Sequence, residues 1–235
     1  RCKHEYVYDY VTYGHLGGYR CTNCGYQRPQ PQVHVTKVLT TDDEHSEVIF
    51  EENGRPVPAN IHLPGGYNIY NACACMAAAS VMGIDMELAA KSLSSFACGF
   101  GRMEKFQIGG TDVRMILIKN PAGCNQVLNF LTQRSEPFTF VTCLNDRMQD
   151  GKDVSWIWDV DFERLTAMGG ALSDIYVSGV RADDMALRFL YAGFPKERIH
   201  VQKDYAQLME EATSRKLPVF VMPTYTAMLA LRGTI

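Results

Sequence analysis

The sequence lacks the charge surplus, the long apolar run and the basic leader that mark three common classes of protein. Its 235 residues carry 23 lysines and arginines against 26 aspartates and glutamates, so no excess of cations is available to neutralise the phosphates of a nucleic acid. The longest uncharged stretches, such as residues 217–231, are shorter than the roughly 20 apolar residues of a spanning helix. No basic segment followed by an apolar run appears at the start. We therefore expect no nucleic-acid partner, no transmembrane segment and no secretory signal.

Several catalytic and phosphate-binding motifs are also missing. The sequence contains no G-x-x-x-x-G-K-[ST] loop, no H-E-x-x-H, no G-x-S-x-G and no G-x-G-x-x-G. His62 and His200 form no recognisable pair with a serine or a cysteine, so a self-contained hydrolase is not expected. The chain begins with arginine rather than methionine. We interpret it as the C-terminal part of a longer protein, in which the main phosphate cradle for any ATP would precede residue 1.

The eight cysteines divide into two groups. One group lies in alanine-rich segments or beside apolar runs, where cysteine usually serves as a small buried hydrophobe. Its members are Cys73, Cys75, Cys98, Cys124 and Cys143. The other group is Cys2 together with Cys21 and Cys24, a C-x-x-C pair that Gly25 follows. Two thiolates at this spacing can bind one tetrahedral zinc ion from a tight turn, so the pattern predicts a zinc ribbon.

The fourth ligand of this zinc site is not evident. A four-thiolate ribbon needs a second cysteine near Cys2, and we expect that it lies upstream of residue 1. His4 or His15 could complete the site instead, although both are more simply interpreted as surface residues. A closed four-ligand site leaves no position for water or substrate, so the zinc would be structural. It would supply most of the free energy that folds so small a ribbon.

Beyond the ribbon, short apolar runs alternate with amphipathic stretches. Asn53-Gly54 between two strand-like runs predicts a β-hairpin, and an alanine-rich stretch closed by Gly83 predicts a helix. Alternation of this kind indicates an α/β fold with a largely parallel sheet. The expected strands are residues 47–52, 59–63, 113–118, 138–143, 174–177 and 219–222, and the expected helices are residues 67–82, 86–94, 122–132, 183–191 and 205–214.

Loops that follow the strands of such a sheet usually carry its functional groups. Residues 119–123 and residues 144–153 form two such loops. The first could equally be a simple strand-to-helix turn in which proline opens the helix. The second is acidic and could be a solvated loop. Trp156 and Trp158 follow it closely, however, and large aromatic side chains tend to be buried.

Four motifs resemble the Mur ligase superfamily. LPGGYNIYNA at residues 63–72 is similar to a signature near the end of the ATP-binding central domain, and GRME at residues 101–104 resembles the link to the C-terminal domain. KNPAGCNQ at residues 119–126 and DGKDVSWIWDVDFE at residues 150–163 resemble the MurT family within that superfamily. The MurT family also resembles this chain in having a four-cysteine zinc ribbon inserted in the central domain, like the segment with Cys2, Cys21 and Cys24.

The resemblance covers nearly the whole chain and implies three regions. Residues 1–33 would be a zinc-ribbon insert truncated at its start, and residues 34–107 the C-terminal part of the Mur ligase central ATP-binding domain. Residues 108–235 would form a Rossmann-like C-terminal domain of the MurT type. The chain departs from the family in lacking the first ribbon cysteine and the N-terminal ATPase portion. We therefore expect no ligase activity from these 235 residues alone.

The resemblance also implies a function in peptidoglycan biosynthesis. MurT-family proteins are the ligase-like subunits of lipid II isoglutaminyl synthase and work as a heterodimer with a GatD-type glutaminase. ATP with Mg²⁺ would activate the D-glutamate α-carboxyl of the lipid II stem peptide, and ammonia from the glutaminase would convert it to D-isoglutamine. The missing leader, the reduced cysteines and the need for ATP predict a cytoplasmic protein that acts at the inner face of the membrane.

By the same resemblance, four residues would contact the nucleotide. Asn68 and Asn71 would line the adenine pocket, where a side-chain amide can both donate to the base and accept from it. Arg102 would approach the ribose or the phosphates, and Asn120 would reach the nucleotide from the C-terminal domain. Because Asn68 and Asn71 are three residues apart, they could instead cap the helix.

Asp146 is the candidate catalytic residue. In the family an aspartate of the C-terminal domain is thought to complete a triad whose cysteine and histidine belong to the glutaminase. Such an acid orients the imidazole and stabilises the imidazolium. Asp146 is favoured because it comes directly after the apolar run that ends at Cys143, and Asp150 and Asp153 are the alternatives.

Two other functions stay open. A stand-alone Mur-type or folylpolyglutamate-type ligase would join an amino acid to a carboxylate without a glutaminase. A zinc-ribbon adaptor would only bind a partner. Activity of the full-length protein on a free amino acid would favour the first. A lack of ATP turnover with partner and lipid substrate present would favour the second.

Overall fold

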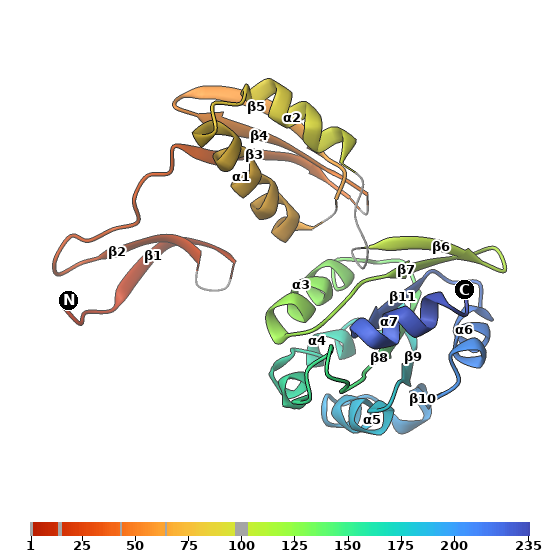
Figure 1. Ribbon diagram of the computed structural model, residues 1–235. Helices are drawn as coiled ribbons and strands as arrows, with labels where there is room; N and C mark the ends of the chain where they lie inside the picture. Colours follow the sequence, from red (N-terminus) through yellow and green to blue (C-terminus); the bar gives the residue numbers. More distant parts are fainter. Residues whose placement is uncertain (1, 14–15, 43, 64, 97–102) are drawn as a thin grey trace. The chain divides into compact units, whose positions relative to one another are not determined.

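The chain folds into two compact units, residues 1–97 and residues 98–235 (Figure 1). The computed structural model describes all residues except 1, 14–15, 43, 64 and 97–102. Each unit has a hydrophobic core of its own. The first unit carries the cysteines of the expected ribbon and the second carries Asp146.

The first unit contains a hairpin and a separate three-stranded sheet. Strands β1 (Tyr6–Tyr13) and β2 (Leu16–Cys21) pair antiparallel. Strands β3 (Val33–Thr41), β4 (Ser46–Glu52) and β5 (Arg55–Ile61) form an antiparallel sheet in that order. Asn53 and Gly54 have φ values of 49° and 86°, as a two-residue hairpin turn requires, which confirms the predicted hairpin. β5 tolerates Pro56 and Pro58 because it lies at an edge of the sheet.

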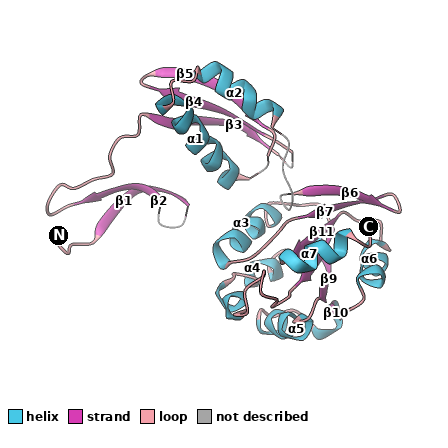
Figure 2. Cartoon of the chain, in the orientation of Figure 1, coloured by secondary structure: helices cyan, strands magenta, loops and turns pink. Residues whose placement is uncertain are grey.

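Two helices complete the core of this unit, α1 (Gly66–Val81) and α2 (Met86–Ser95) (Figure 2). Met76 of α1 and Phe50 of β4 are fully buried in the same cluster. Asp85 begins α2, and its side chain accepts a hydrogen bond from the backbone N–H of Leu88 at 2.9 Å. Such a cap satisfies one of the free N–H groups at the start of a helix.

A six-stranded sheet forms the centre of the second unit. Its strands are β6 (Glu104–Ile108), β7 (Thr111–Met115), β8 (Phe138–Cys143), β9 (Leu172–Ser178), β10 (Ile199–Val201) and β11 (Val219–Pro223). Their order is β10-β9-β8-β11-β7-β6, and all neighbours are parallel except β6 and β7. The predicted α/β fold with a mainly parallel sheet is confirmed. Because β6 pairs with β7, the second unit includes residues before the expected boundary at 108.

Helices cover both faces of this sheet (Figure 1). One face packs against α3 (Pro121–Leu131), η1 (Ser155–Asp159), α4 (Glu163–Thr166) and α5 (Ala182–Tyr191), and the other against α6 (Tyr205–Thr213) and α7 (Tyr225–Arg232). The short turns η2 (Gly169–Ala171) and η3 (Lys196–Arg198) precede β9 and β10. Phe140 and Val141 are neighbours on β8 but belong to opposite cores, because successive strand residues point to opposite faces.

Most of the predicted elements are present, with shifted ends. The strand predicted at residues 138–143 coincides with β8, whereas β5 begins four residues before the strand predicted at 59–63. The sequence interpretation missed the strands β1, β2, β3, β6 and β10 and the helices α4 and α7. None of the described helices combines the length and hydropathy that a bilayer span requires.

Candidate functional site

The loops that follow β7, β8, β9 and β11 meet at one edge of the sheet, the carboxyl edge. β11, the last strand of the chain, lies between β7 and β8, so the strand order reverses at this point. Ligand and catalytic groups of open α/β sheets gather where the order reverses. Both predicted loops, residues 119–123 and 144–153, begin beyond the carboxyl ends of strands in this part of the sheet.

Asn145 holds three of these loops together from a buried position. Its side-chain Oδ1 accepts from the backbone N–H of Val180 at 2.9 Å, and its Nδ2 donates to Oγ1 of Thr226 at 2.9 Å. Its backbone N–H donates to Oγ1 of Thr224 at 3.0 Å. An amide side chain suits this position because it donates and accepts at once. The residue before Asp146 is thereby fixed against the loops after β9 and β11.

Asp146 lies beside two opposite charges, Arg181 in the loop after β9 and Asp184 on α5. One carboxylate oxygen of Asp146 is 3.7 Å from Nη1 of Arg181, and Nε of Arg181 is 2.8 Å from a carboxylate oxygen of Asp184. The Asp146 side chain is 31% exposed. The carboxylate therefore lies beside the positive charge of an arginine and is still accessible from outside the unit.

The two alternative acids have local structural partners. Asp150 accepts from the backbone N–H of Thr226 at 2.8 Å and from its hydroxyl at 2.5 Å, which ties the loop to the start of α7. Asp153 accepts from the backbone N–H of Ser155 at 2.9 Å. Hydrogen bonds from the side chain and backbone of Ser155 hold the pKa of Asp153 below its ordinary value. The geometry thus distinguishes Asp146 from both alternatives.

Tyr205, at the start of α6, is a residue of this region that the sequence interpretation missed. Burial raises its pKa to about 12, and the neighbouring Cys143 adds to the effect. A hydrogen bond with the side chain of Asn145 acts in the opposite direction. The phenol therefore stays protonated at neutral pH and contributes a hydroxyl to the polar network around Asn145.

The tryptophan-rich motif folds around a buried arginine. Arg188 is only 3% exposed, and its guanidinium donates to the carbonyl oxygens of Ile157 at 3.0 Å and Val160 at 2.6 Å. It also forms a two-pronged ion pair with Glu163, with both N–O distances at 2.9 Å. This contact holds the pKa of Glu163 below its ordinary value. Three residues of the motif, Ile157, Val160 and Glu163, thus bind the same buried guanidinium.

The two tryptophans differ in burial. Trp156 packs partly buried against the core, whereas Trp158 is 47% exposed and meets Tyr191 edge to face at 5.4 Å. The guanidinium of Arg188 lies 5.5 Å from the Trp158 ring centre, a cation–π contact. The expectation that both rings are buried is therefore wrong for Trp158, because its ring covers the arginine from outside.

Gly179 allows the loop after β9 to approach the loop after β8. We expect Gly179→Ala to lower the free energy of unfolding by about 2 to 4 kcal/mol. Its φ is +91°, and a Cβ atom there would lie 2.4 Å from the carbonyl oxygen of Leu144. Gly151→Ala is the matched control, because its φ is +89° and no heavy atom lies within 4 Å of an added Cβ. Chemical denaturation should show a loss of about 1 kcal/mol for the control. Equal losses for the two variants would refute the steric argument.

Two of the candidate nucleotide contacts lie together in the first two turns of α1. Asn68 is buried, and Nδ2 of Asn71 donates to its Oδ1 at 3.3 Å. The N-cap of α1 is Gly65, and no side chain caps the helix. The alternative interpretation that the two asparagines cap α1 is therefore wrong.

The other two candidates are Asn120 and Arg102. Asn120 caps α3, since its Oδ1 accepts from the backbone N–H of Gly123 at 2.8 Å and Pro121 opens the helix. The loop of residues 119–123 is thus a strand-to-helix turn, as the simpler interpretation predicted. Arg102 lies outside the described residues.

Cys2, Cys21 and Cys24 converge in the first unit. Sγ of Cys2 is 3.4 Å from Sγ of each of the other two, and all three atoms lie within 4.8 Å of one another. Tetrahedral zinc with Zn–S bonds of about 2.3 Å needs sulfur separations of about 3.8 Å, so the three thiolates fit a zinc ion. Within the described residues no histidine or acid joins this group, His4 included, and His15 lies outside them.

The turn around Cys21 directs backbone N–H groups toward the sulfur of that cysteine. Gly25 has a φ of +73°, and its backbone N–H donates to the carbonyl oxygen of Cys21 at 3.1 Å. Backbone N–H groups of Cys24 and Asn23 point at the Cys21 sulfur and lower the pKa of its thiol to about 7. Gly25 thus has the left-handed backbone conformation that closes this turn.

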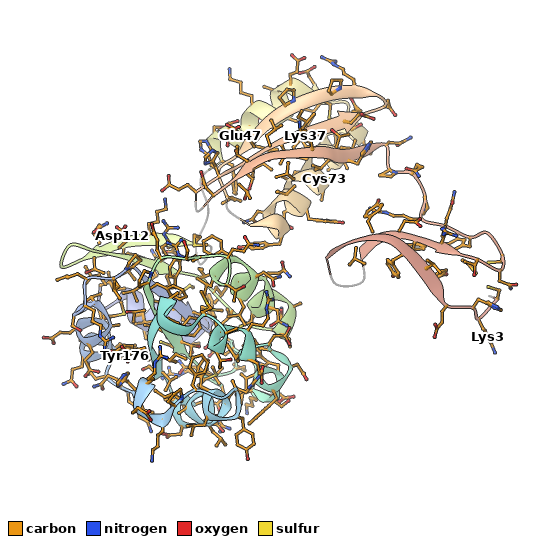
Figure 3. The ribbon with its side chains drawn as sticks, turned by 180° about the vertical axis from the view of Figure 1, so that it is seen from behind. Lys3, Lys37, Glu47, Cys73, Asp112 and Tyr176 are labelled. Atoms are coloured by element: carbon orange, nitrogen blue, oxygen red, sulfur yellow. The ribbon has the colours of Figure 1, made fainter. Side chains whose placement is uncertain are left out.

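The other cysteines behave only in part as small hydrophobes. Cys124 and Cys143 are fully buried, and burial raises the pKa of both thiols, which confirms the interpretation for these two. Cys73, labelled in Figure 3, is half-buried near the carbonyl oxygen of Val33 at 3.8 Å. Cys75 is exposed because α1 turns it away from the core, so the interpretation is wrong there. Cys98 is not among the described residues, and the seven described cysteines are all free.

Comparison with known proteins identifies the family. Residues 117–228 match the model of MurT ligase C-terminal domains. The chain is 34% identical, over 98% of its length, to the MurT subunit of lipid II isoglutaminyl synthase (glutamine-hydrolysing) from Streptococcus pneumoniae. The chain belongs to the MurT family. It is also 28% identical, over 97% of its length, to the MurT subunit from Staphylococcus aureus, and it spans about half of these relatives, 51% and 50%.

Solved structures show that this MurT-family chain has a Mur ligase-like fold. A pseudomurein peptide ligase type C from Methanothermus fervidus superposes with a TM-score of 0.68 at 18% identity, over 99% of this chain and 47% of the ligase. The UDP-N-acetylmuramate–alanine ligase MurC from Thermotoga maritima gives a TM-score of 0.65 at 13% identity, over 86% of this chain and 45% of MurC. At these identities the likeness concerns the fold alone. The matched MurT segment contains Asn120, Asp146 and the whole tryptophan-rich motif.

Proposed function

We propose that the full-length protein is the ligase-like subunit of a glutamine-dependent enzyme that amidates the D-glutamate α-carboxyl of lipid II. The observation that carries the proposal is the 34% identity to a MurT subunit over 98% of this chain. The enzyme would be an ATP-dependent carbon–nitrogen ligase of peptidoglycan biosynthesis, acting at the cytoplasmic face of the membrane. Since the chain spans about half of its relatives, these 235 residues alone would be inactive.

The chemistry follows from the weak electrophilicity of a carboxylate. ATP supplies the phosphoryl group that gives the carboxyl carbon a leaving group. Ammonia then attacks that carbon, the new C–N bond forms, and the C–O bond to phosphate breaks with loss of inorganic phosphate. Ammonia delivered through an enclosed route from a glutaminase escapes protonation and loss to water. A partner subunit of the GatD type, in a heterodimer, would provide it.

Asp146 is the residue that we assign to the partner's chemistry. Its accessible carboxylate at the carboxyl edge can accept a hydrogen bond from the partner's catalytic imidazole, and thereby stabilise the imidazolium that forms when the cysteine loses its proton. Asp150 and Asp153 are already engaged by Thr226 and Ser155, which supports Asp146 over them.

The nucleotide and the metal ions would be held by separate groups. Asn68 and Asn71 would contact the adenine, where their amides can donate and accept, and Arg102 and Asn120 would approach the nucleotide from their own segments. Mg²⁺ would accompany the phosphates. Residues 1–33 would form a zinc-ribbon insert, residues 34–107 the end of the ATP-binding domain and residues 108–235 the MurT-type domain.

The test measures four reactions with the full-length protein and its partner: glutamine hydrolysis, lipid II amidation, amino-acid ligation and ATP turnover. Glutamine hydrolysis by the partner should appear only when the full-length protein is present, and amidation of lipid II should require ATP, glutamine and both proteins. A glutaminase equally active alone would refute the shared site. Ligation of a free amino acid without the partner would favour a stand-alone ligase, and no ATP turnover with all components would favour an adaptor.

Zinc should bind to the three ribbon cysteines at about one equivalent per full-length chain, and Cys24→Ser should abolish most of it. Loss of a thiolate ligand weakens the site and unfolds the hairpin that the metal organises. Elemental analysis and limited proteolysis of residues 1–33 would measure both effects. Cys75 is an exposed cysteine of α1 outside this group, so the Cys75→Ser variant should retain the zinc. Equal zinc contents in the two variants would rule out this site.

A further inference from the structure

Three charged side chains at the carboxyl edge form a row in which the signs alternate. Arg181 stands between Asp146 and Asp184, with N–O distances of 3.7 and 2.8 Å. All three side chains are between 31% and 43% exposed, so the row faces the outside of the unit. The sequence separates Asp146 from Arg181 by 35 positions, and only the pairing of β8 with β9 brings them together.

We infer that Arg181 is a positioning residue that sets both the orientation of Asp146 and the electrostatic potential that Asp146 presents to the partner's histidine. This inference rests on the proposed function, in which Asp146 contacts that histidine. Nothing in the shared-triad chemistry itself requires an arginine beside the acid. The assignment therefore adds a residue to the site.

The backbone of Arg181 is anchored to the loop that carries Asp146. Its N–H donates to the carbonyl oxygen of Leu144 at 2.9 Å, and the preceding N–H, of Val180, donates to Asn145 Oδ1 at 2.9 Å. The planar guanidinium then spans the two carboxylates, Nη1 toward Asp146 and Nε to Asp184. Both contacts are ion pairs rather than hydrogen bonds, and one planar cation between the two carboxylates restrains Asp146 more than a flexible ammonium would.

The row also has an electrostatic consequence. The positive charge of Arg181 offsets part of the negative potential of Asp146, and Asp184 restores part of it. A more negative potential stabilises the imidazolium and raises the pKa of the partner's histidine, and a less negative potential lowers that pKa. Removing Arg181 and removing Asp184 must therefore shift the pH dependence of hydrolysis in opposite directions.

The experiment measures kcat/KM for glutamine hydrolysis against pH, with the full-length protein in complex with its glutaminase. Arg181→Gln should move the acid limb upward by on the order of 0.5 to 1 pH unit, and Asp184→Asn should move it downward by a similar or smaller amount. Both shifts should shrink at high salt, because exposed charges are screened. Arg181→Lys should leave the limb in place, because the charge stays. It should lower the plateau by about 3- to 10-fold, because an ammonium does not span Asp146 and Asp184 as the planar guanidinium does.

Asp183→Asn is the matched control. Asp183 is the neighbour of Asp184 on α5, is exposed, and pairs with Lys203 at 2.9 Å, so its loss removes the same charge outside the row. The acid limb of kcat/KM against pH should be the same for Asp183→Asn as for the unmodified protein. If the role of Arg181 were purely structural, its variants would have a lower plateau. The acid limb would then not shift in opposite directions for Arg181→Gln and Asp184→Asn.

Two results would overturn the inference, and they are distinguishable. If Asp146→Asn lowers hydrolysis while Arg181→Gln and Asp184→Asn keep the original acid limb, the inference fails and the proposed function stands. If Asp146→Asn leaves hydrolysis unchanged in an intact complex, the proposed role of Asp146 fails and the inference with it. Should Arg181→Gln fail to fold, Arg181→Lys and Asp184→Asn still test the predicted shifts.

Discussion

Asp146→Asn in the full-length protein should lower glutamine hydrolysis by the glutaminase partner by about 10²- to 10⁴-fold, by analogy with the acid of a serine-protease triad. The amide keeps the shape of the side chain but carries no charge, so it cannot stabilise the imidazolium and favours the wrong tautomer. Asn145, not Asp146, holds the surrounding loops, so the fold should persist. Release of glutamate by the complex is the quantity to measure.

The control for this variant is Asp159→Asn, which removes an exposed acid at the end of η1. It should leave hydrolysis within about two-fold of the unmodified complex. Sedimentation or gel filtration must show that both variants still bind the glutaminase. Full hydrolysis by an intact Asp146→Asn complex would transfer the role to Asp150 or Asp153, or reject a shared triad.

Arg188→Met should destabilise the second unit by about 3 to 5 kcal/mol. The variant keeps much of the apolar volume but leaves the carbonyl oxygens of Ile157 and Val160 without their donor, at about 1 to 3 kcal/mol each. It also removes the charge that pairs with Glu163 and the cation–π contact with Trp158. Chemical denaturation measures the total, and hydrogen exchange over residues 155–166 should show the loss locally.

Arg164→Met is the comparison for this prediction. Arg164 belongs to the neighbouring helix α4, is exposed, and bonds only to the side chains of Asn129 and Thr132 in the contacts described. Its replacement should cost less than about 1 kcal/mol. Arg188→Lys should lose most of what Arg188→Met loses, because an ammonium cannot reach three acceptors in one plane. Similar stabilities for Arg188→Met and Arg164→Met would contradict the structural role of the buried arginine.

Several residues that shape the site gave only faint signals in the sequence. Arg188 interrupts the apolar face of the helix predicted at residues 183–191, and it is buried there with Met185 and Phe189. An arginine at that helical spacing is a signal for a buried ion pair, and it could have been noticed. Asn145 and Arg181 gave no such signal, because their partners lie on loops that are distant in the chain.

The candidate ligands were predictable to different degrees. The C-x-x-C spacing and Gly25 place two candidate zinc ligands in one turn by local geometry, so the sequence suffices to bring Cys21 and Cys24 together. Cys2 joins them only because β1 and β2 pair and bring residues 19 positions apart into contact. The loop of residues 119–123 was predicted to be either a functional loop or a strand-to-helix turn. The turn is confirmed, and its cap by Asn120 involves a backbone N–H only three positions away.

Sequence alone specified the features that depend on neighbouring residues: the hairpin at Asn53-Gly54, the helices with their regular apolar spacing, the mainly parallel sheet and the family motifs. Tertiary structure decided which loops share an edge. β11 inserts between β7 and β8, and this long-range pairing places Thr226 beside Asn145 and Asp150. The pairing of β8 with β9 places Arg181 beside Asp146. Strand order is set by packing over the whole sheet, so no local pattern could have shown which charges would meet.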